Sequence, residues 1–350
     1  MDFTKKVFRE VGADAMLTES ADLRLYLTGY PSSFGFVYTD AQESILFTDP
    51  RYAESAKAAM RGQRIGVEIA RSEDTVLDYI KSKKIKKLAV PFERTTFPQM
   101  LSLRKRGFKL VDSMPAFTDA MEVKSEEERA FIARAANVAE EAYIRLLGQL
   151  REGMTENETA ALLEYEMRRC GAEDRSFETI AAFGANTSVP HHAAGETRLK
   201  KGMPVLLDFG CKVGGYCSDI TRTFLFGKDG ADGFADAYAA VLEAHERALG
   251  KVRAGMTGRE ADELARGVLR GRGLDKFFTH SLGHGIGVNI HESPTLGPSG
   301  TRVLREGMVF SIEPGVYFEG RFGIRIEDSV QLTAQGAVSF MKTDKKLTVL

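Results

Sequence analysis

An internal repeat constrains the fold of this chain more than any other feature of its sequence. The segments REGMTENETAALLEYEMRRCG (151–171) and RAGMTGREADELARGVLRGRG (253–273) share R-x-G-M-T-x-x-E and a closing glycine at the same offset. In each copy the threonine stands three residues before the glutamate, which is the capping-box signature of a helix N-terminus. The repeat predicts two similar structural units within the chain.

A second pair of similar segments follows in the same order. TRLKKGMPVLLDFG ends with Asp208 and Gly210, and TRVLREGMVFSIEPG ends with Glu313 and Gly315. In both segments a glycine stands six residues, and a methionine five residues, before the carboxylate. Two repeats in one order predict two helix-then-hairpin lobes related by approximate two-fold symmetry, with a cleft between them.

Residues 201–226 are predicted to form a β-hairpin in the first lobe. An apolar run reaches Asp208, Gly214 and Gly215 form the predicted turn, and the second strand carries Asp219. A loop at 213–214 would place Asp208 opposite residue 219, whereas a loop at 214–215 would place it opposite residue 221. In both registers Asp208 and Asp219 share a face, because side chains alternate along a strand. Such a pair needs a cation or a proton between its members, unless both are solvated surface residues.

The second lobe supplies its own pair of carboxylates. Glu313 closes the strand MVFSIE, and Glu327 lies on the predicted strand FGIRIEDSVQL. In that strand Arg325 shares a face with Glu327 and is interpreted as a salt-bridge partner that steadies the neighbouring carboxylates. One pair of carboxylates could share a proton, but four in one cleft favour metal ions as the compensating charge.

A histidine-rich segment, HSLGHGIGVNIHESP (280–294), supplies the remaining candidate ligand. His284, between Gly283 and Gly285, is the predicted metal ligand, and His291 is a candidate for contact with the substrate. An oxygen-rich site with one imidazole favours manganese, cobalt, iron or zinc over a thiolate zinc site. Carboxylates that can bridge favour two ions about 3.5–4 Å apart.

Composition excludes several other classes of protein. The 48 basic and 49 acidic residues give a net charge of −1, which offers no electrostatic basis for binding nucleic acid or a membrane surface. Three cysteines do not make a disulfide framework, and no apolar stretch approaches membrane length. Together with an N-terminus that does not resemble a signal peptide, these features predict a cytoplasmic protein.

The length of 350 residues predicts two domains. Residues 1–122 alternate short β-rich runs with helices, which predicts an α/β domain around a mixed sheet. No glycine loop in it would cradle a phosphate, so a scaffold or oligomerisation role is favoured. Ser125 and Glu128 form a predicted capping box that starts a long helix, so the second domain is predicted to span 123–350.

Taken together, these motifs resemble the pita-bread metallopeptidases, the group of aminopeptidase P, prolidase and creatinase. D-x-G…G-Y-x-S-D-I-T-R-T, G-H-G-I-G…H-E, E-P-G and R-I-E-D occur as that family has them, and Y-L-T-G-Y (26–30) and T-D-P-R-Y (48–52) resemble its N-terminal domain. The resemblance covers nearly the whole chain. It implies an α+β pita-bread catalytic domain with pseudo-two-fold symmetry, preceded by a creatinase-like α/β domain.

The resemblance also implies a role for each candidate ligand. Asp208 would chelate one metal ion, and His284 with Glu313 would hold the other. Asp219 and Glu327 would bridge the two ions. Manganese or cobalt is expected, with zinc or iron as alternatives.

Three residues are expected to act on the substrate. Glu313 would take a proton from the attacking water and deliver it to the leaving nitrogen. His191, in N-T-S-V-P-H, and His291 match the family's first-lobe and second-lobe histidines near the scissile bond.

The function implied is Xaa-Pro aminopeptidase activity on short proline-containing peptides, in an enzyme that is expected to be a homodimer. The alternatives are an Xaa-Pro dipeptidase (prolidase), a methionine aminopeptidase, a creatinase, and a non-catalytic pita-bread binding module. The N-terminal domain disfavours methionine aminopeptidase, and the full ligand set disfavours the last two. An arginine commonly follows H-E-x-P in prolidases, whereas this chain has Thr295, which favours the aminopeptidase unless Arg325 or a basic residue from the N-terminal domain of a partner subunit supplies the cation instead.

Overall fold

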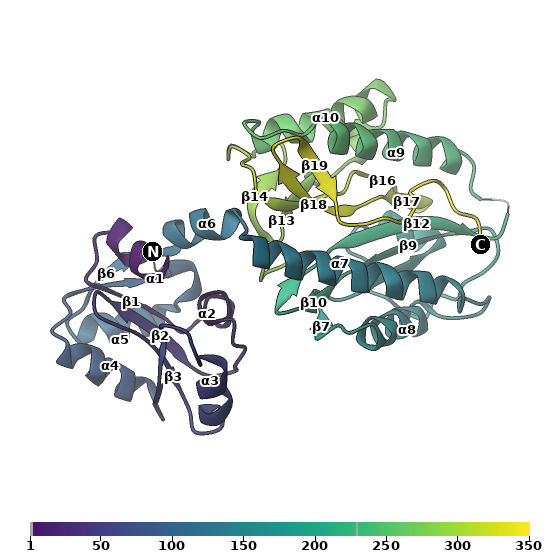
Figure 1. Ribbon diagram of the computed structural model, residues 1–350. Coiled ribbons are helices and arrows are strands. Elements are labelled where there is room, and N and C mark those ends of the chain that lie inside the picture. Colours follow the sequence, from purple (N-terminus) through teal and green to yellow (C-terminus); the bar gives the residue numbers. More distant parts are fainter. Residues whose placement is uncertain (1–2, 229) are drawn as a thin grey trace. The chain divides into compact units, whose positions relative to one another are not determined.

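The computed structural model describes residues 3–228 and 230–350 (Figure 1). The chain divides into two compact units, Met1–Met121 and Glu122–Leu350. Each unit buries hydrophobic clusters made only of its own residues. Among the described residues, no helix is long and apolar enough to cross a membrane.

The first unit is built around a six-stranded mixed sheet in the order β4-β3-β2-β1-β5-β6. The strands are β1 (Ala15–Thr18), β2 (Phe36–Asp40), β3 (Ser44–Thr48), β4 (Gly66–Ile69), β5 (Lys87–Val90) and β6 (Lys109–Asp112). The helices are α1 (Phe3–Glu10), α2 (Ala21–Thr28), α3 (Ala53–Ala59), α4 (Glu73–Ser82), η1 (Phe92–Arg94), α5 (Phe97–Lys105) and α6 (Met114–Glu122). The sequence did not reveal β1, because this short strand is buried on both faces and shows no alternation of polar and apolar residues.

The second unit places helices on either side of its strands (Figure 1). The helices are α7 (Glu126–Leu147), α8 (Glu156–Arg169), η2 (Gly184–Ser188), α9 (Phe234–Lys251), α10 (Gly258–Gly271) and η3 (Asp275–Phe277). The first-lobe strands are β7 (Asp174–Arg175), β8 (Ile180–Phe183), β9 (Met203–Phe209), β10 (Cys211–Val213), β11 (Tyr216–Cys217) and β12 (Ile220–Phe226). The second-lobe strands are β13 (Gly283–Gly285), β14 (Glu292–Leu296), β15 (Val309–Ile312), β16 (Gly315–Phe318), β17 (Phe322–Arg325), β18 (Asp328–Thr333) and β19 (Gly336–Ser339).

The two lobes of the second unit repeat each other in backbone detail. The N–H of Gly153 donates to the carbonyl of Leu199 at 2.8 Å, and the N–H of Gly255 donates to the carbonyl of Leu304 at the same distance. Helices α8 and α10 begin with the two predicted capping boxes, and α7 begins with the third. The sequence repeat therefore corresponds to a structural repeat.

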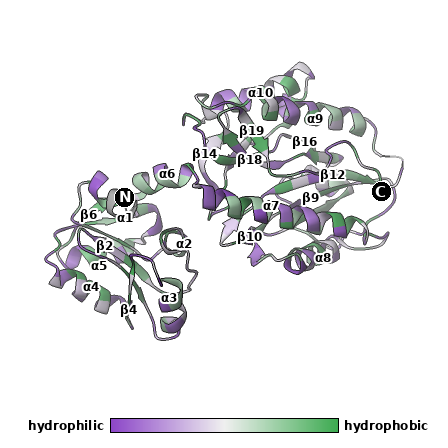
Figure 2. Cartoon of the chain, in the orientation of Figure 1, coloured by the Kyte–Doolittle hydropathy of each residue, from purple (hydrophilic) through white to green (hydrophobic). Residues whose placement is uncertain are grey.

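Each lobe has its own hydrophobic core beneath its pair of helices. Alanine-rich faces of α7 and α9 are buried, and the opposite faces carry charged residues, so both helices are amphipathic. Figure 2 shows hydrophilic and hydrophobic residues alternating along these helices. This packing covers the outer face of each sheet and leaves the inner strand residues to line a cleft between the lobes.

The predicted hairpin is divided into two parts. Strand β9 pairs with β12 so that Asp208 lies opposite Thr221, while Gly214 and Gly215, with φ of 60° and 77°, form the turn between β10 and β11. This is the second of the two predicted registers. The division falls at Gly210, where a Cβ atom would lie 1.9 Å from the carbonyl oxygen of Ser218.

The predicted single strand at 322–332 is wrong. It is two strands, because β17 pairs with β16 whereas β18 pairs with β15 and β19. Between them the chain passes to the first lobe, where the N–H of Glu327 donates to the carbonyl of Thr221 at 3.1 Å. Arg325 and Glu327 nevertheless both face the cleft.

Candidate metal centre and active site

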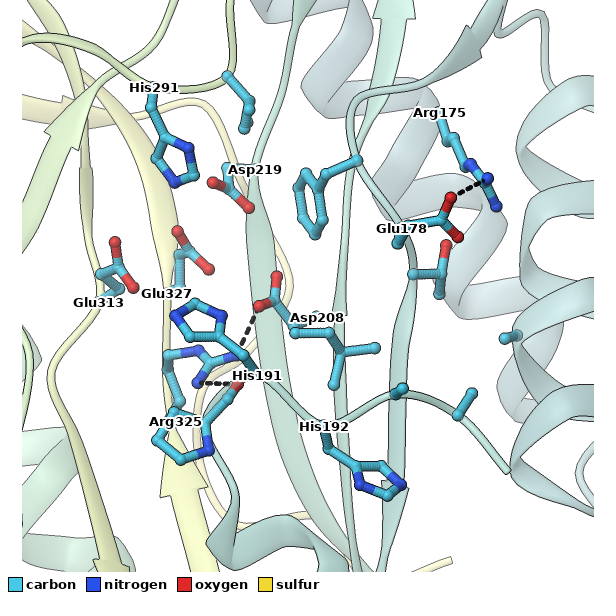
Figure 3. A pocket seen from close by; sticks show the side chains of 18 of the residues that line it. Arg175, Glu178, His191, His192, Asp208, Asp219, His291, Glu313, Arg325 and Glu327 are labelled. Carbon is cyan, nitrogen blue, oxygen red and sulfur yellow. Dashed lines mark hydrogen bonds and ion pairs between the residues drawn. The ribbon is translucent and has the colours of Figure 1, made fainter. Parts of the chain in front are cut away.

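A cavity of about 920 Å³ lies within the second unit, lined by both lobes. Figure 3 shows that one group of side chains of its wall converges on one region, whereas Glu178 and His192 lie apart from it. The group contains Asp208, Asp219, Glu313, Glu327, His191, His291 and Arg325. Every predicted site residue lines this cavity: Asp208, Asp219, His284, Glu313, Glu327, His191, His291 and Arg325.

Three of the five predicted ligands form a compact cluster. Ligand atoms of Asp219, His284 and Glu327 all lie within 4.8 Å of one another. Nε2 of His284 lies 3.5 Å from Oδ2 of Asp219 and 3.4 Å from Oε1 of Glu313. Glu313 is therefore a fourth predicted ligand that lies close to the His284 imidazole. Carboxylates and one imidazole in this arrangement are a donor set for a divalent ion.

Asp208, the fifth predicted ligand, is tied to Arg325. Nη2 of Arg325 donates to Oδ2 of Asp208 at 2.5 Å, and Nη1 donates to the hydroxyl of Tyr317 at 2.6 Å. Nε of the same guanidinium donates to Oγ1 of Thr221 at 3.0 Å. Arg325 is therefore fully engaged and brings one fixed positive charge to the carboxylate cluster.

The buried carboxylates retain unused acceptor atoms. Within the described part of the chain, Oδ1 of Asp208, Oδ1 of Asp219 and Oε1 of Glu327 are buried without a hydrogen-bond partner. A buried oxygen in this condition is costly unless it is paired or coordinates a cation. The three oxygens thus fit a metal centre, because Arg325 donates a hydrogen bond to none of them.

Burial and mutual repulsion disfavour ionisation of this cluster. Burial, followed by the neighbouring carboxylates, raises the pKa of Asp219 and of Glu327 well above the ordinary range. Burial also raises the pKa of Glu313 to about 7, against the opposing charge of Arg325. A cation between these groups would lower all three pKa values, because it stabilises the ionised forms.

This repulsion predicts a pH-dependent stabilisation by metal. Glu313 titrates near pH 4.5 in the unfolded chain and near 7 in the metal-free fold, and the pKa values of Asp219 and Glu327 are raised in the same direction. The metal-free fold therefore binds more protons than the unfolded chain and loses stability as the pH rises towards about 7. The gain in Tm on adding manganese should therefore grow between pH 5 and 7.5. Thermal unfolding with and without the ion at four pH values checks this. A gain that is the same at every pH would show that the carboxylates do not bind the ion.

Neighbouring groups orient the candidate ligands. The Nδ1–H of His284 donates to the carbonyl of Gly285 at 3.1 Å, which leaves Nε2 as the free ligand atom. Oγ1 of Thr221 donates to Oε2 of Glu327 at 2.6 Å, and Oγ of Ser311 donates to Oε1 of Glu313 at 3.0 Å. Neither hydroxyl was predicted from the sequence, although Thr221 shares strand parity with Asp219 and could have been found from it.

Two further histidines of the cavity lie close to predicted ligands: His291 lies next to His284, and His280 lies next to Glu313. The rings of His284 and His291 are in T-shaped contact, with centroids 4.3 Å apart. His280 lies with Nδ1 4.0 Å from Oε2 of Glu313, and its Nε2 is 2.9 Å from the hydroxyl of Tyr317. Burial lowers the pKa of His280 to about 3, so its ring is neutral. No role for His280 was predicted from the sequence, and Tyr317 belongs to no motif that would have indicated one.

The loop that carries His191 is fastened by one buried carboxylate. Glu156, at the start of α8, accepts hydrogen bonds from Asn186 Nδ2 at 2.8 Å and from the N–H of Gly195 at 3.0 Å. Its Oε2 also lies 2.9 Å from Nε2 of His192. These bonds close the loop over the first-lobe wall of the cavity and hold His191 there.

A cluster of buried carboxylates and one imidazole, set in a cavity between two repeated lobes, defines a metal-dependent hydrolase. The comparisons with known proteins identify which kind. The family model described as Metallopeptidase family M24 matches residues 130–334, and the model described as Creatinase/Prolidase N-terminal domain matches residues 4–123. The chain belongs to metallopeptidase family M24, which confirms the predicted family and fold class.

Relatives cover the chain almost from end to end. It is 34% identical over 322 residues to the Xaa-Pro dipeptidase of Pyrococcus furiosus, covering 91% of this chain and 90% of that protein. The crystal structure of an X-Pro aminopeptidase from Thermotoga maritima superposes with a TM-score of 0.92 at 34% identity, covering 99% and 100% of the two chains. An Xaa-Pro dipeptidase from Bacillus anthracis gives a TM-score of 0.94 at 33% identity, covering 99% and 98%.

Proposed function

We propose that this chain is an Xaa-Pro aminopeptidase that uses two divalent metal ions to release the N-terminal residue of short peptides with proline in second position. The observation that carries the proposal is the convergence of Asp219, His284 and Glu327 in the cavity of a chain whose relatives are named Xaa-Pro dipeptidase and X-Pro aminopeptidase. The main alternative is an Xaa-Pro dipeptidase. A homodimer and a cytoplasmic location remain predictions from the sequence.

The residues that would hold the ions are those named from the sequence. Asp208 would bind one ion, His284 and Glu313 the other, and Asp219 and Glu327 both. Four carboxylates roughly neutralise the charge of two divalent ions, and the oxygen-rich donor set with one imidazole suits manganese, cobalt, iron or zinc. The resemblance to the family favours manganese or cobalt among these. When bound, the ions supply Lewis-acid polarisation of a peptide carbonyl and activation of a water molecule.

The chain itself supplies proton transfer and orientation. Glu313 accepts the proton of the attacking water and returns it to the leaving nitrogen, and Ser311 keeps its carboxylate in one orientation. His191 and His291 face the same cavity from opposite lobes, where they can donate hydrogen bonds to the substrate carbonyl. Arg325 fixes Asp208.

Proline in the second position requires a site of this kind. An Xaa-Pro bond is a tertiary amide without an N–H group, so a peptidase that binds its substrate through that hydrogen cannot hold it. Polarisation of the carbonyl oxygen does not need an N–H donor. The cavity wall between the two histidines is the proposed place for the proline ring.

The charged residues of the cavity favour an aminopeptidase over a dipeptidase. A strict dipeptidase needs a cation for the free carboxylate beyond proline, and arginine suits this best. Thr295, which lies opposite His284 in the β13–β14 pair, lines the cavity and carries no charge. The two arginines of the lining are already paired, Arg325 with Asp208 and Arg175 with two glutamates.

Peptide length provides the experiment that tests this proposal. The chain should hydrolyse Ala-Pro-Ala with a higher kcat/KM than Ala-Pro, because among the described residues both arginines that line the cavity are already paired and would not bind the carboxylate of the dipeptide. Steady-state kinetics on the two peptides measure the ratio. A tenfold preference for the dipeptide, about 1.4 kcal/mol in transition-state binding, would assign the chain to the dipeptidases instead.

A designed variant sharpens the comparison. Thr295→Arg should raise kcat/KM for Ala-Pro relative to Ala-Pro-Ala, since a charged hydrogen bond to the carboxylate contributes about 1.5–3 kcal/mol. Thr295→Gln is the matched control, because it adds length and donors without a charge. An equal effect of both substitutions would show that charge at this position does not select for peptide length.

A further inference from the structure

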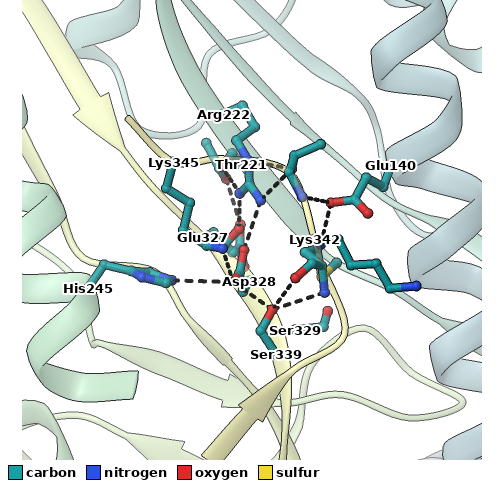
Figure 4. A network of polar contacts seen from close by, with 12 residues as sticks. Glu140, Thr221, Arg222, His245, Glu327, Asp328, Ser329, Ser339, Lys342 and Lys345 are labelled. Atoms are coloured by element: carbon teal, nitrogen blue, oxygen red, sulfur yellow. Dashed lines mark hydrogen bonds and ion pairs between the residues drawn. The ribbon is translucent and has the colours of Figure 1, made fainter. Parts of the chain in front are cut away.

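A buried network of charges lies directly behind the candidate metal centre (Figure 4). Arg222 and Asp328 are 3% and 0% exposed, and Nη2 of Arg222 donates to Oδ1 of Asp328 at 3.0 Å. Nζ of Lys345 lies 2.8 Å from Oδ2 of the same carboxylate, and His245 of α9 approaches it to 3.9 Å. Desolvation makes such a network expensive, and apolar residues often stabilise a core as well. Its position suggests a task other than stability.

The network lies on the side of two chain segments that faces away from the cavity, and the same segments carry candidate site residues on the side that faces it. Thr221 and Arg222 are neighbours on one segment, and Glu327 and Asp328 are neighbours on another. Thr221 donates to the carboxylate of Glu327 on the cavity side, while Arg222 pairs with Asp328 on the other side. The same two segments are therefore joined twice, once on each face.

Arg222 also binds the main chain of the candidate ligand. Its Nη1 donates to the carbonyl oxygen of Glu327 at 2.6 Å and to that of Thr221 at 3.0 Å. Glu327 is thus fixed at its carboxylate by Thr221 and at its backbone by Arg222. The guanidinium fork makes this possible, because several N–H donors lie in one plane at fixed angles.

The C-terminal segment, which is distant in sequence, also contacts Arg222. Oγ1 of Thr343 accepts from Nη2 of Arg222 at 3.0 Å, 121 residues away in sequence. The N–H groups of Lys342 and Thr343 donate to Oε1 of the buried Glu140 of α7 at 2.7 and 2.6 Å. Residues 342–345 are therefore anchored on α7 through Glu140, and at Lys345 they contact Asp328, the residue next to Glu327.

We propose that Arg222, with residues 342–345 behind it, is a positioning element that fixes Glu327 for metal binding. The inference rests on the proposed function, in which Glu327 binds both ions. A carboxylate that serves two cations must hold both oxygens in place, and a mobile backbone would spread their positions. Groups that orient metal ligands typically affect affinity by 10–100-fold.

Metal affinity in two variants tests the proposal. Arg222→Lys keeps the positive charge beside Asp328, but an ammonium cannot reach Asp328, Thr343 and the Glu327 carbonyl in the fixed fork geometry. We expect its manganese Kd, measured by chelator competition, to rise about 10–100-fold. Thr343→Val removes one acceptor of the fork and no charge, and its Kd should rise by a smaller factor. Neither substitution touches the cavity, so KM for Ala-Pro-Ala at saturating metal should stay unchanged.

A matched control separates positioning from general loss of stability. Arg24→Lys alters another arginine that is 3% exposed and that donates to main-chain carbonyls, those of Glu19 and Ser32, and it does not line the cavity. It should change Tm without changing the manganese Kd. Wild-type affinity in folded Arg222→Lys would overturn the inference alone. If that variant is not recovered folded, Thr343→Val decides, and an unchanged Kd there overturns it. Wild-type protein that binds no divalent ion would instead overturn the proposed function itself.

Discussion

Glu313→Gln is expected to lower kcat by about 10²–10⁴-fold, the contribution usual for general acid–base catalysis. The amide has nearly the shape of the carboxylate but cannot take up a proton, and it is a weaker metal ligand. The fold should be preserved, because the side chain remains at the cavity wall beside Ser311. Single-turnover and steady-state rates at saturating manganese, with Tm as a check on folding, measure the effect.

Glu319→Gln serves as the control for this substitution. Glu319 is exposed at the turn that follows β16, so the control makes the same chemical change without altering the cavity. It should leave kcat unchanged. If Glu313→Gln itself retained near-wild-type turnover, another group would carry the proton.

Removal of metal should have the second large effect. Treatment with a chelator should abolish activity, and manganese or cobalt should restore it, with about two ions bound per chain by native mass spectrometry. The reason is the set of buried acceptor oxygens on Asp208, Asp219 and Glu327, which have no partner among the described residues. At a concentration 100 times Kd, each ion should also stabilise the fold by about 2.7 kcal/mol.

Asp219→Asn tests the same metal centre by changing one of its proposed ligands. Because Asp219 is proposed to contact both ions, the asparagine variant should bind fewer than two ions and lose activity together with them. Its apo form should be at least as stable as the apo wild type, since one repelling charge is gone from the cluster. Full activity in wild-type protein shown by mass spectrometry to hold no metal would contradict the whole proposal.

The features of the site that depend on local periodicity could be predicted from the sequence. Asp208 and Asp219 share a face because strands alternate, whichever register the hairpin adopts, and the structure realises the register with Asp208 opposite Thr221. The capping boxes at Thr155 and Thr257 are equally local, since each needs residues only three apart. Local rules of this kind hold wherever tertiary contacts agree with them.

Contacts between distant segments could not be predicted in this way. The apolar alternation of 322–332 continues across the point where the chain changes partners, so nothing in the pattern marks the break before Glu327. Tyr317 meets Arg325 and His280 only because three separate elements converge on the cavity. The bond of Arg222 with Thr343 joins residues far apart in sequence that no motif connects.

The repeated lobes have a consequence for how such a site could arise. Asp208 and Asp219 come from one lobe, and His284, Glu313 and Glu327 come from the other. A shorter ancestor with a single lobe could have enclosed a comparable cavity only by pairing with a second copy of itself, at a rate set by its concentration. Joining the two copies in one polypeptide makes that encounter intramolecular. It also allows each half to change alone, so one half could retain aspartates while the other acquired glutamates and a histidine.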